Sequence, residues 1–383
     1  MEFKRLGDLA TYINGYAFKP EQWGKTGLPI IRIQNLNNVD AELNYFDGEI
    51  DQKYVINHGD VLIAWSASLG VYEWQREKAL LNQHIFKVVF NKLTVDKTYF
   101  KFMVSYALNL ATKYLHGSTM KHITKKYFDE IKIPYPDISI QERLGKALEQ
   151  VMNLQKKRQS QITALDELTQ SLFLEMFGDP KVNNFNWDIG EIKDLTSNTQ
   201  YGSSKKASEE IGKYPILRMN NITYNGGWDL KQLKYIDLDE KEIERYTVKR
   251  GDILFNRTNS KELVGKTAVF RETDVYSYAG YLIRLRVNNK ANPEFISAYL
   301  NSKYGKSILL NKAKSIVGMA NINAKELQSI PVYLPPKELQ DTFAEYYHEI
   351  LKQQERLEIA LGEMKTLYSS LLQKAFKGEL FQE

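Results

Sequence analysis

The sequence contains no cysteine among its 383 residues. Disulfide bonds, thiolate zinc sites and cysteine nucleophiles are therefore excluded. Histidine is scarce too, and its five residues are scattered without the spacing of metal ligands. Long hydrophobic runs are also missing, because no stretch approaches the roughly 20 apolar residues of a membrane span. The first residues lack the apolar stretch of a secretory signal. We therefore expect a cytoplasmic protein without a metal site.

Known catalytic motifs are present only as near matches. Residues 265–267 (GKT) look like the end of a phosphate-binding loop, but Ser260 stands where that loop needs its first glycine. The pair Pro335-Pro336 lacks both the preceding Asn or Asp and the following ring of an amino-methyltransferase motif. A Gly-x-Ser-x-Gly nucleophile elbow does not occur. We expect no catalytic residue and no cofactor bound by this chain. An enzyme with an unfamiliar site stays open as an alternative.

The composition is that of a globular protein, with 43% hydrophobic and 26% charged residues. The length is sufficient for two domains that each bury their own core. A formal net charge of +5 suits an anionic partner, although many proteins without such a partner share it. The 24 tyrosines suit a binding interface, although core and sheet positions also account for most of them.

The chain contains an internal repeat, which is the most informative feature of the sequence. Residues 29–36 (PIIRIQNL) return as residues 215–222 (PILRMNNI), and residues 59–63 (GDVLI) return as residues 251–255 (GDILF). Ile131, Pro136 and Gln141 then correspond to Ile330, Pro335 and Gln340. These matches occur in the same order in both copies. The separation between the copies grows along the chain, as expected if the second copy carries insertions in its loops.

Each copy has the same two-part plan. Its first part is mixed: residues 28–33, 61–63 and 85–90 are typical of strands, while residues 99–114 and 293–313 carry apolar residues at helical spacing. Its second part follows a proline signal and is a long helix with apolar residues every seven positions. We expect these positions to form a spacer seam, and they are Leu144, Val151, Leu165 and Leu172 in the first helix and Phe343, Ile350, Leu357, Met364 and Leu371 in the second.

The intervening apolar positions, such as Ala147, Leu154 and Leu168 in the first helix and Tyr346, Ala360 and Leu367 in the second, complete this pattern. A helix of roughly 38 residues is about 55–60 Å long, and its narrow apolar stripe needs a partner. The other long helix is the simplest partner. The alternative is that each stripe packs against its own globular domain.

We therefore predict an α+β fold with a pseudo-two-fold internal repeat, in which two similar globular domains are separated by two long helices in an antiparallel coiled coil. The expected boundaries are residues 1–138 for the first recognition domain, 139–178 for the central spacer helix, 179–335 for the second recognition domain and 336–383 for the C-terminal spacer helix. Such a protein could contact two separated places on duplex DNA.

Several stretches resemble the specificity subunits of type I restriction–modification systems. They lie in both copies and are residues 14–19 (NGYAFK), 59–64 (GDVLIA), 81–84 (LNQH), 201–205 (YGSSK), 215–222 (PILRMNNI), 251–260 (GDILFNRTNS), 262–266 (ELVGK) and 321–323 (NIN). Ile140-Gln141 and Leu339-Gln340 resemble the conserved spacer regions of that family.

The resemblance implies a DNA specificity subunit without catalytic activity. Each globular domain would read one half of a bipartite target in double-stranded DNA. The helices would set the distance between the half-sites and dock two modification subunits, which bind S-adenosylmethionine and methylate adenine. Restriction and translocase subunits, with ATP and Mg, would complete the complex. A repeat-built scaffold that binds proteins and has no DNA role is the alternative, and salt-sensitive DNA affinity would distinguish the two.

DNA contacts require basic and small polar side chains on the loops between strands. The candidates in the first copy are Lys19, Arg32, Gln34, Asn35, Trp65, Ser66, Ser68, Gln83, His84 and Lys121. The candidates in the second copy are Ser203, Ser204, Lys205, Lys206, Arg218, Asn220, Asn256, Arg257, Thr258, Asn259 and Ser260. Arg32 and Arg218 recur in both copies, so a scaffold or phosphate role fits them as well as base reading. The segments that differ, residues 64–66 against 256–258, are the better candidates for distinct specificity.

Overall fold

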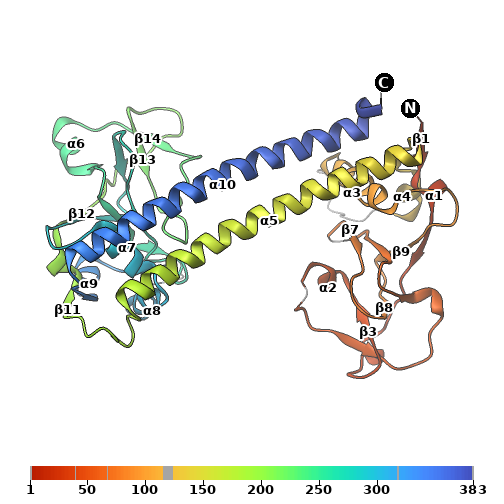
Figure 1. The fold of residues 1–383 in the computed structure, drawn as a ribbon, viewed down its shortest axis with the longest axis horizontal. Coiled ribbons are helices and arrows are strands. Elements are labelled where there is room, and N and C mark those ends of the chain that lie inside the picture. Colours follow the sequence, from red (N-terminus) through yellow and green to blue (C-terminus); the bar gives the residue numbers. More distant parts are fainter. Residues whose placement is uncertain (1, 39, 67, 115–123, 317–318, 382–383) are drawn as a thin grey trace. The chain divides into compact units, whose positions relative to one another are not determined.

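The computed structural model describes residues 2–38, 40–66, 68–114, 124–316 and 319–381. The chain forms two units, of which the first contains residues 1–159 and 359–383 and the second residues 160–358 (Figure 1). Both units combine helices with mixed sheets. The predicted α+β fold with two similar globular parts is therefore confirmed, and each unit also includes a segment of both long helices.

The first unit contains short strands and helices, which include strands over the expected residues 61–63 and 85–89 and a helix over the expected residues 99–114. The strands are β1 Phe3–Arg5, β2 Thr11–Asn14, β3 Leu28–Ile31, β4 Asn44–Phe46, β5 Val55–Ile56, β6 Val61–Ala64, β7 Gly70–Glu73, β8 Ala79–Leu81, β9 Ile85–Val89 and β10 Lys132–Pro134. The helices are α1 Leu6–Leu9, α2 Ile33–Asn37, α3 Lys97–Tyr114 and α4 Lys125–Glu130, with short 3-10 turns η1 Pro20–Gln22 and η2 Gln52–Tyr54.

The second unit repeats these elements and adds a small sheet. Its strands are β11 Ile189–Glu191, β12 Thr196–Tyr201, β13 Tyr214–Leu217, β14 Lys234–Ile236, β15 Thr247–Val248, β16 Ile253–Asn256, β17 Thr258–Asn259, β18 Thr267–Val269, β19 Tyr276–Tyr278, β20 Leu282–Val287, β21 Lys314–Ile316, β22 Met319–Asn321 and β23 Pro331–Tyr333. Its helices are α6 Glu240–Tyr246, α7 Pro293–Asn301, α8 Lys303–Lys312 and α9 Ala324–Gln328, with the 3-10 turn η3 Ile192–Leu195.

The sheet topology is the same in both units. The order β2-β9-β6-β7 in the first corresponds to β12-β20-β16-β18 in the second, and β4-β3-β8-β5 corresponds to β14-β13-β19-β15. Even the one parallel pairing in the second of these sheets recurs, as β3 with β8 and as β13 with β19. The small sheet β17-β22-β21 has no counterpart among the described strands of the first unit.

The turn before the central strand shows how the repeated residues build repeated structure. Gly59 and Gly251 have φ values of +83° and +90°, a region that glycine adopts without steric cost. The carboxylates of Asp60 and Asp252 then accept hydrogen bonds from the backbone amides of Asn57 and Lys249, at 2.8 and 2.9 Å. These turns fix the start of β6 and of β16.

A cation supports this turn in both units, half-buried in the first and buried in the second. Lys87 Nζ donates to the backbone oxygen of Val55 at 2.8 Å and lies 3.0 Å from a carboxylate oxygen of Asp60. Its counterpart is Arg284, which donates to the backbone oxygen of Thr247 at 2.6 Å and lies 3.9 Å from a carboxylate oxygen of Asp252. The repeat therefore preserves an interaction even where the residue type changes.

The long helices are α5 Ile138–Phe177 and α10 Lys337–Lys377, and a 3-10 turn, η4 Glu379–Phe381, follows α10. They lie side by side in each unit (Figure 1). In the first unit Gln155 Nε2 donates to the backbone oxygen of Met364 at 3.0 Å. In the second unit Gln354 Nε2 donates to a carboxylate oxygen of Asp166 at 3.1 Å.

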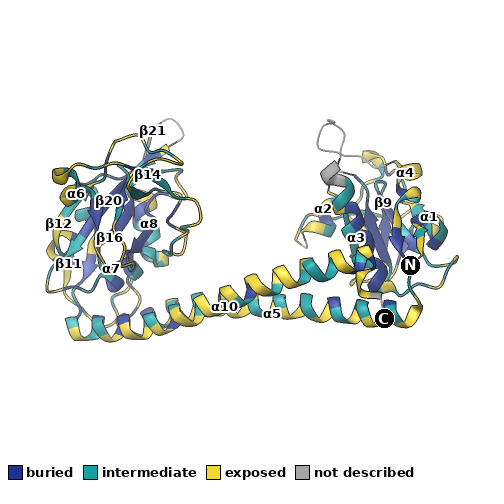
Figure 2. Cartoon of the chain, turned by 90° about the horizontal axis from the view of Figure 1, so that it is seen from above, coloured by how far each residue is buried: buried dark blue, intermediate teal, exposed yellow. Residues whose placement is uncertain are grey.

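The apolar stripes of the long helices pack against the other long helix and also against the globular parts. Leu144 and Leu371 pack into the core of the first unit, and Leu172 and Phe343 into the core of the second. The nine predicted seam residues are all buried or half-buried. Of the intervening positions, however, Leu154, Leu168, Tyr346 and Leu367 are exposed, so the apolar stripe is narrower than the sequence pattern suggests. Figure 2 shows the alternation of buried and exposed residues along α5 and α10.

A buried glutamine joins each long helix to its globular part. Gln141 Nε2 donates to the backbone oxygen of Pro136 at 2.8 Å, and its Oε1 accepts from the amide of Asp96 at 3.1 Å. Gln340 makes the equivalent bonds, to the oxygen of Pro335 at 2.8 Å and from the amide of Asn292 at 2.8 Å. These two glutamines occupy the places where the sequence resembles conserved spacer regions.

Two sequence-based element boundaries need correction. Residues 293–313 form two helices because Ser302 ends α7 and caps α8, where its side chain accepts a hydrogen bond from the amide of Gly305 at 3.0 Å. The strand expected over residues 28–33 ends at Ile31, and a short helix begins at Ile33. The cause is Asn35, whose side chain accepts from the amide of Arg32 at 3.1 Å and closes a helical turn.

Candidate nucleic-acid interface

The ends of the equivalent strands β6 and β16 place Trp65 and Arg257 at the same position of the repeat. Ala64, the last residue of β6, pairs with Ile85, and Asn256, the last residue of β16, pairs with Leu282. The next amides also make equivalent bonds, from Trp65 to the oxygen of His84 at 3.2 Å and from Arg257 to the oxygen of Tyr281 at 3.0 Å. The backbone therefore presents two different side chains at one place in the fold.

In the second unit, Arg257 belongs to a preorganised polar cluster. Its guanidinium carbon lies 4.7 Å from the centroid of the Tyr201 ring, a cation–π contact. Its Nη2 donates to Asn321 Oδ1 at 3.3 Å, and Asn321 Nδ2 donates to Thr258 Oγ1 at 2.8 Å. The Tyr201 hydroxyl accepts from the amide of Ala324 at 2.9 Å. Strands β12, β17 and β22 thus supply the residues that surround one half-buried arginine.

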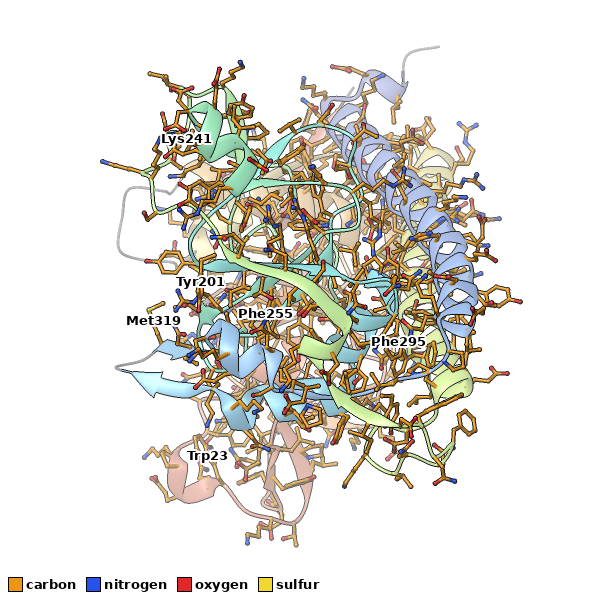
Figure 3. All side chains as sticks on the ribbon, turned by 90° about the vertical axis from the view of Figure 1, so that its left-hand side faces the viewer. Trp23, Tyr201, Lys241, Phe255, Phe295 and Met319 are labelled. Atoms are coloured by element: carbon orange, nitrogen blue, oxygen red, sulfur yellow. The ribbon has the colours of Figure 1, made fainter. Side chains whose placement is uncertain are left out.

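This cluster lies at an edge of the second unit. Figure 3 shows Tyr201 and Met319 at this edge, while Phe255 points into the interior. Tyr201 and Met319 are 37% and 45% exposed, whereas Phe255 is fully buried. Phe255 belongs to β16, whose four residues are all buried, whereas Tyr201 ends β12 and Met319 begins β22. This edge, which we call the rim, therefore combines the Arg257 guanidinium, the Tyr201 phenol ring, the Asn321 amide and the flexible apolar side chain of Met319.

In the first unit, the same position holds a different cluster. The Trp65 Nε1 donates to Asn14 Oδ1 at 3.1 Å. The Trp65 ring is stacked on Phe86, with centroids 5.6 Å apart, and meets His84 edge-on at 4.9 Å. Asn14 ends β2, as Tyr201 ends β12, so the partner position is equivalent as well. The repeat therefore brings the same two positions together in both units but fills them with Asn and Trp in one and with Tyr and Arg in the other.

The repeated arginines support a turn in each unit. The amide of Arg32 bonds to Asn35 Oδ1 at 3.1 Å, and that of Arg218 bonds to Asn221 Oδ1 at 2.9 Å. The Arg32 guanidinium lies 5.0 Å from the centroid of the Trp23 ring, and Arg218 Nη2 donates to the oxygen of Gln232 at 3.4 Å. The shared bonds are made by the backbone amides and the two guanidinium groups have different contacts, so the role of both side chains stays a prediction.

The structure buries some of the predicted DNA-binding residues. The side chains with less than a tenth of their surface exposed are Asn35, Ser66, Ser203, Asn256 and Thr258. Asn35 donates to the backbone oxygens of Ala41 and Glu42, and Ser203 Oγ accepts from the amide of Lys205 at 3.2 Å. Loop-forming polar residues have the same composition as base-reading ones, so the sequence could not separate them. The burial of these five side chains fits a structural role, and a DNA contact by any of them stays a prediction.

The remaining candidates are accessible. The half-buried ones are Arg32, Trp65, Gln83, His84, Arg218, Arg257, Asn259 and Ser260, and the exposed ones are Lys19, Gln34, Ser68, Ser204, Lys205, Lys206 and Asn220. Lys205 forms an ion pair with Glu242, and this hydrogen bond raises the pKa of the lysine. Any phosphate contact by Lys205 therefore competes with a carboxylate. Lys121 lies outside the described residues.

Sequence reasoning missed the partners of the accessible residues. Asn14, Tyr201 and Asn321 were not among the predicted DNA-binding residues, although each orients one of them. The available signal was their place in the family-like stretches 14–19, 201–205 and 321–323. That signal could not show the pairing, because the partners belong to different strands far apart in the chain.

Residues 260–267 resemble a phosphate-binding loop in sequence but do not form one in the structure. Thr267 begins strand β18, whereas a phosphate-binding loop leads into a helix. Lys266 Nζ donates to the backbone oxygens of Met219 and Ile222. Within the described residues there is no group of three or more Asp, Glu or His side chains suited to a metal ion. None of the helices in this part of the chain is long and apolar enough to span a membrane.

Comparison with known proteins agrees with these features. The family model described as "Type I restriction modification DNA specificity domain" matches residues 1–164 and 184–361. The EcoKI specificity subunit of Escherichia coli strain K12 is 24% identical over 409 residues, which cover 98% of this chain and 88% of that protein.

Solved structures share the fold. The S subunit of a type I restriction–modification system from M. genitalium aligns over 98% of this chain and 96% of its own, with a TM-score of 0.61 and 15% identity. A chain from a study of complex assembly and conformational transition of the type I R-M system aligns over 98% and 97%, with a TM-score of 0.58 and 16% identity. With the family model covering most of both units, this chain belongs to the family of type I restriction modification DNA specificity domains.

Proposed function

We propose that this chain is the non-catalytic DNA specificity subunit of a type I restriction–modification complex, and that each globular unit reads one half of a bipartite target. One observation carries the proposal: equivalent positions on two copies of one scaffold hold Asn14 with Trp65 and Tyr201 with Arg257. A duplicated scaffold with unlike residues at its rim is what two different half-sites require.

Arg257 is the strongest candidate for reading a base. A guanidinium is planar and holds its N–H donors in a fixed, forked arrangement. Two of these donors can bond at once to O6 and N7 of guanine in the major groove. The Tyr201 ring and Asn321 hold this fork before DNA arrives, which lowers the entropic cost of the contact. Trp65 cannot make that pair and offers stacking or an apolar contact with a thymine methyl group instead.

The proposed division of the chain is residues 1–138 and 179–335 for target recognition and 139–178 and 336–383 for the spacer. The spacer helices set the gap between half-sites and dock two modification subunits. The exposed leucines on them, Leu154, Leu168 and Leu367, support the docking role because α5 and α10 leave them uncovered.

S-adenosylmethionine would be bound by the modification subunits, and ATP and Mg by restriction and translocase subunits. A complex acting on chromosomal DNA would work in the cytoplasm.

The proposal is tested by co-expressing the chain with its modification subunit and mapping methylated adenines across a genome. A bipartite motif is expected. In the variant Arg257→Gln the half-site read by the second unit should lose its preference for one guanine, and the other half-site should stay the same. The control Lys290→Gln removes one exposed positive charge from the same unit and should leave both halves unchanged. A methylation motif that is not bipartite would contradict the proposed function. A motif in the Arg257 variant identical to that of the wild type would contradict the base-reading role of Arg257.

A further inference from the structure

A small basic pocket lies in the second unit beside the proposed base-reading loop. Its volume is 360 Å³, and its walls come from the loop between β17 and β18, from helix α8 and from the turn after Ile222. The lining residues that matter for its chemistry are Tyr224, Lys261, Glu262, Lys266, Lys303 and Lys306. Four lysines thus line a space large enough for a phosphate group.

The positive charge of this pocket is poorly compensated. Lys306 Nζ donates to the backbone oxygen of Tyr224 at 3.0 Å and lies 3.4 Å from the centroid of the Tyr224 ring. Lys266 donates to two backbone oxygens. These acceptors are uncharged. Among the described residues, no carboxylate lies within salt-bridge distance of Lys266, Lys303 or Lys306.

Glu262 is the carboxylate on the pocket wall, but its hydrogen bonds are made elsewhere. Bonds from its own backbone amide and from Ser260 lower its pKa, with a weaker contribution from the charge of Lys261. Burial lowers the pKa of Lys306 to about 8, which is the expected result when an ammonium loses water without gaining an anion. An incoming anion would therefore replace both the lost hydration and the missing counter-charge.

We propose that this pocket binds a phosphate group. We favour the DNA backbone as the source of this phosphate group, and this choice rests on the proposed function. Residues 261–266 of the wall directly follow Arg257–Ser260, and the amide of Gly265 bonds to the oxygen of Asn256 at 2.8 Å, so the pocket wall and the proposed base-reading residues belong to one connection between β16 and β18. Phosphate contacts of this kind fix the register of a protein on the duplex without carrying sequence information. A free phosphate compound is the second source, and the two are separable by experiment.

The first experiment measures DNA binding by the complex of this chain with its modification subunits. In the double variant Lys303→Gln/Lys306→Gln, affinity should fall about tenfold for specific and unrelated duplexes alike, and the salt slope should fall by about one to two. Lys306→Arg keeps the charge and should retain most of the affinity. Lys231→Gln/Lys290→Gln removes two exposed charges of the same unit as a matched control and should change little.

The second experiment measures acetylation of Lys306 by acetic anhydride at pH 8, read out by mass spectrometry. Protection by sub-micromolar duplex identifies the DNA backbone as the source. Protection by pyrophosphate alone, with unchanged DNA affinity of the double variant, identifies a free phosphate compound. Absence of protection by both probes, with unchanged affinity and salt slope, would overturn the proposal. A bipartite methylation motif that still depends on Arg257 would show that the proposed function survives such a failure.

Discussion

A buried ion pair of the second unit shows how single residues hold the fold together. Glu294 is 3% exposed and accepts a bidentate pair of hydrogen bonds from Arg271, with an Nε–Oε1 distance of 2.8 Å. His348 of α10 lies 2.9 Å from the same carboxylate. Burial alone would raise the pKa of Glu294, but the bonds from His348 and Arg271 outweigh it and lower the pKa. This triad ties α7 to α10 and to the loop after β18.

Glu294→Gln should destabilise the protein by about 3 kcal/mol at pH 7, because it leaves the half-buried Arg271 without its counter-charge. The depressed pKa of Glu294 means that its contribution is present above the unfolded-state value of 4.5 and disappears as pH falls through the folded-state value. Urea unfolding at pH 7 and pH 4 checks both points. The difference between wild type and variant should shrink at the lower pH, and an equal difference at both would refute the assignment.

Lys306 predicts a pH dependence of DNA binding. Its pKa of about 8 means that a fraction of the side chains is neutral at slightly alkaline pH. A bound phosphate favours the charged form, so affinity should decrease as pH rises from 7 to 9. Tyr224, Lys261, Glu262, Lys266 and Lys303 face the same pocket, and the control is therefore Lys306→Arg, which stays charged throughout. Equal pH profiles for wild type and Lys306→Arg would count against the role of Lys306.

At the scale of elements, the two glutamines predict equivalent effects in the two units. Gln340→Leu leaves the amide of Asn292 and the oxygen of Pro335 without their buried partner, and we expect a loss of about 2–3 kcal/mol. Gln141→Leu should cost a similar amount because it removes the matching bonds.

Hydrogen exchange can locate these losses. Exchange should accelerate around the start of α7 in the Gln340 variant and around the start of α3 in the Gln141 variant. Gln353→Leu, at an exposed position of α10, is the matched control and should leave exchange in α7 unchanged. An ordinary surface substitution changes the free energy of unfolding by roughly 0.5 kcal/mol or less. If both buried variants stay within that range of wild type, the glutamines are not structural links.

At the scale of the whole molecule, the spacer proposal makes a geometric prediction. Removing one heptad from both α5 and α10 keeps the apolar stripes aligned with each other. The methylation motif should then retain both half-sites but change the number of base pairs between them. Genome-wide mapping of methylated adenines reads out both quantities. Altered half-site bases at an unchanged gap would mean that the helices do not set the distance.

The function of the whole chain also predicts its response to salt. Neutralising each phosphate releases counterions, so the logarithm of the binding constant should fall linearly with the logarithm of salt concentration, with a slope of about −0.9 per contact. A protein-binding scaffold would show no such steep dependence with duplex DNA. Methyl transfer by the purified chain, without an added partner, would point to the alternative of an unfamiliar enzyme.

The sequence by itself determined the features that depend on local order. The Gly-Asp turns and the long helices follow from residues that are near one another in the chain, the repeat from comparing the order of residues in its two halves, and the absence of cysteine chemistry from composition alone. A turn needs glycine where φ is positive, and a helix stripe needs a fixed period, so both are visible without a structure.

Only the tertiary structure decided which polar residues are accessible and which meet. Asn256 and Arg257 are polar neighbours, yet Asn256 is buried as the last residue of β16 and Arg257, directly after the strand, is half-exposed. Tyr201 meets Arg257, and Lys261 shares a pocket with Lys306, because strands and helices remote in sequence pack together. Burial and side-chain contact are properties of that packing, so no local pattern could specify them.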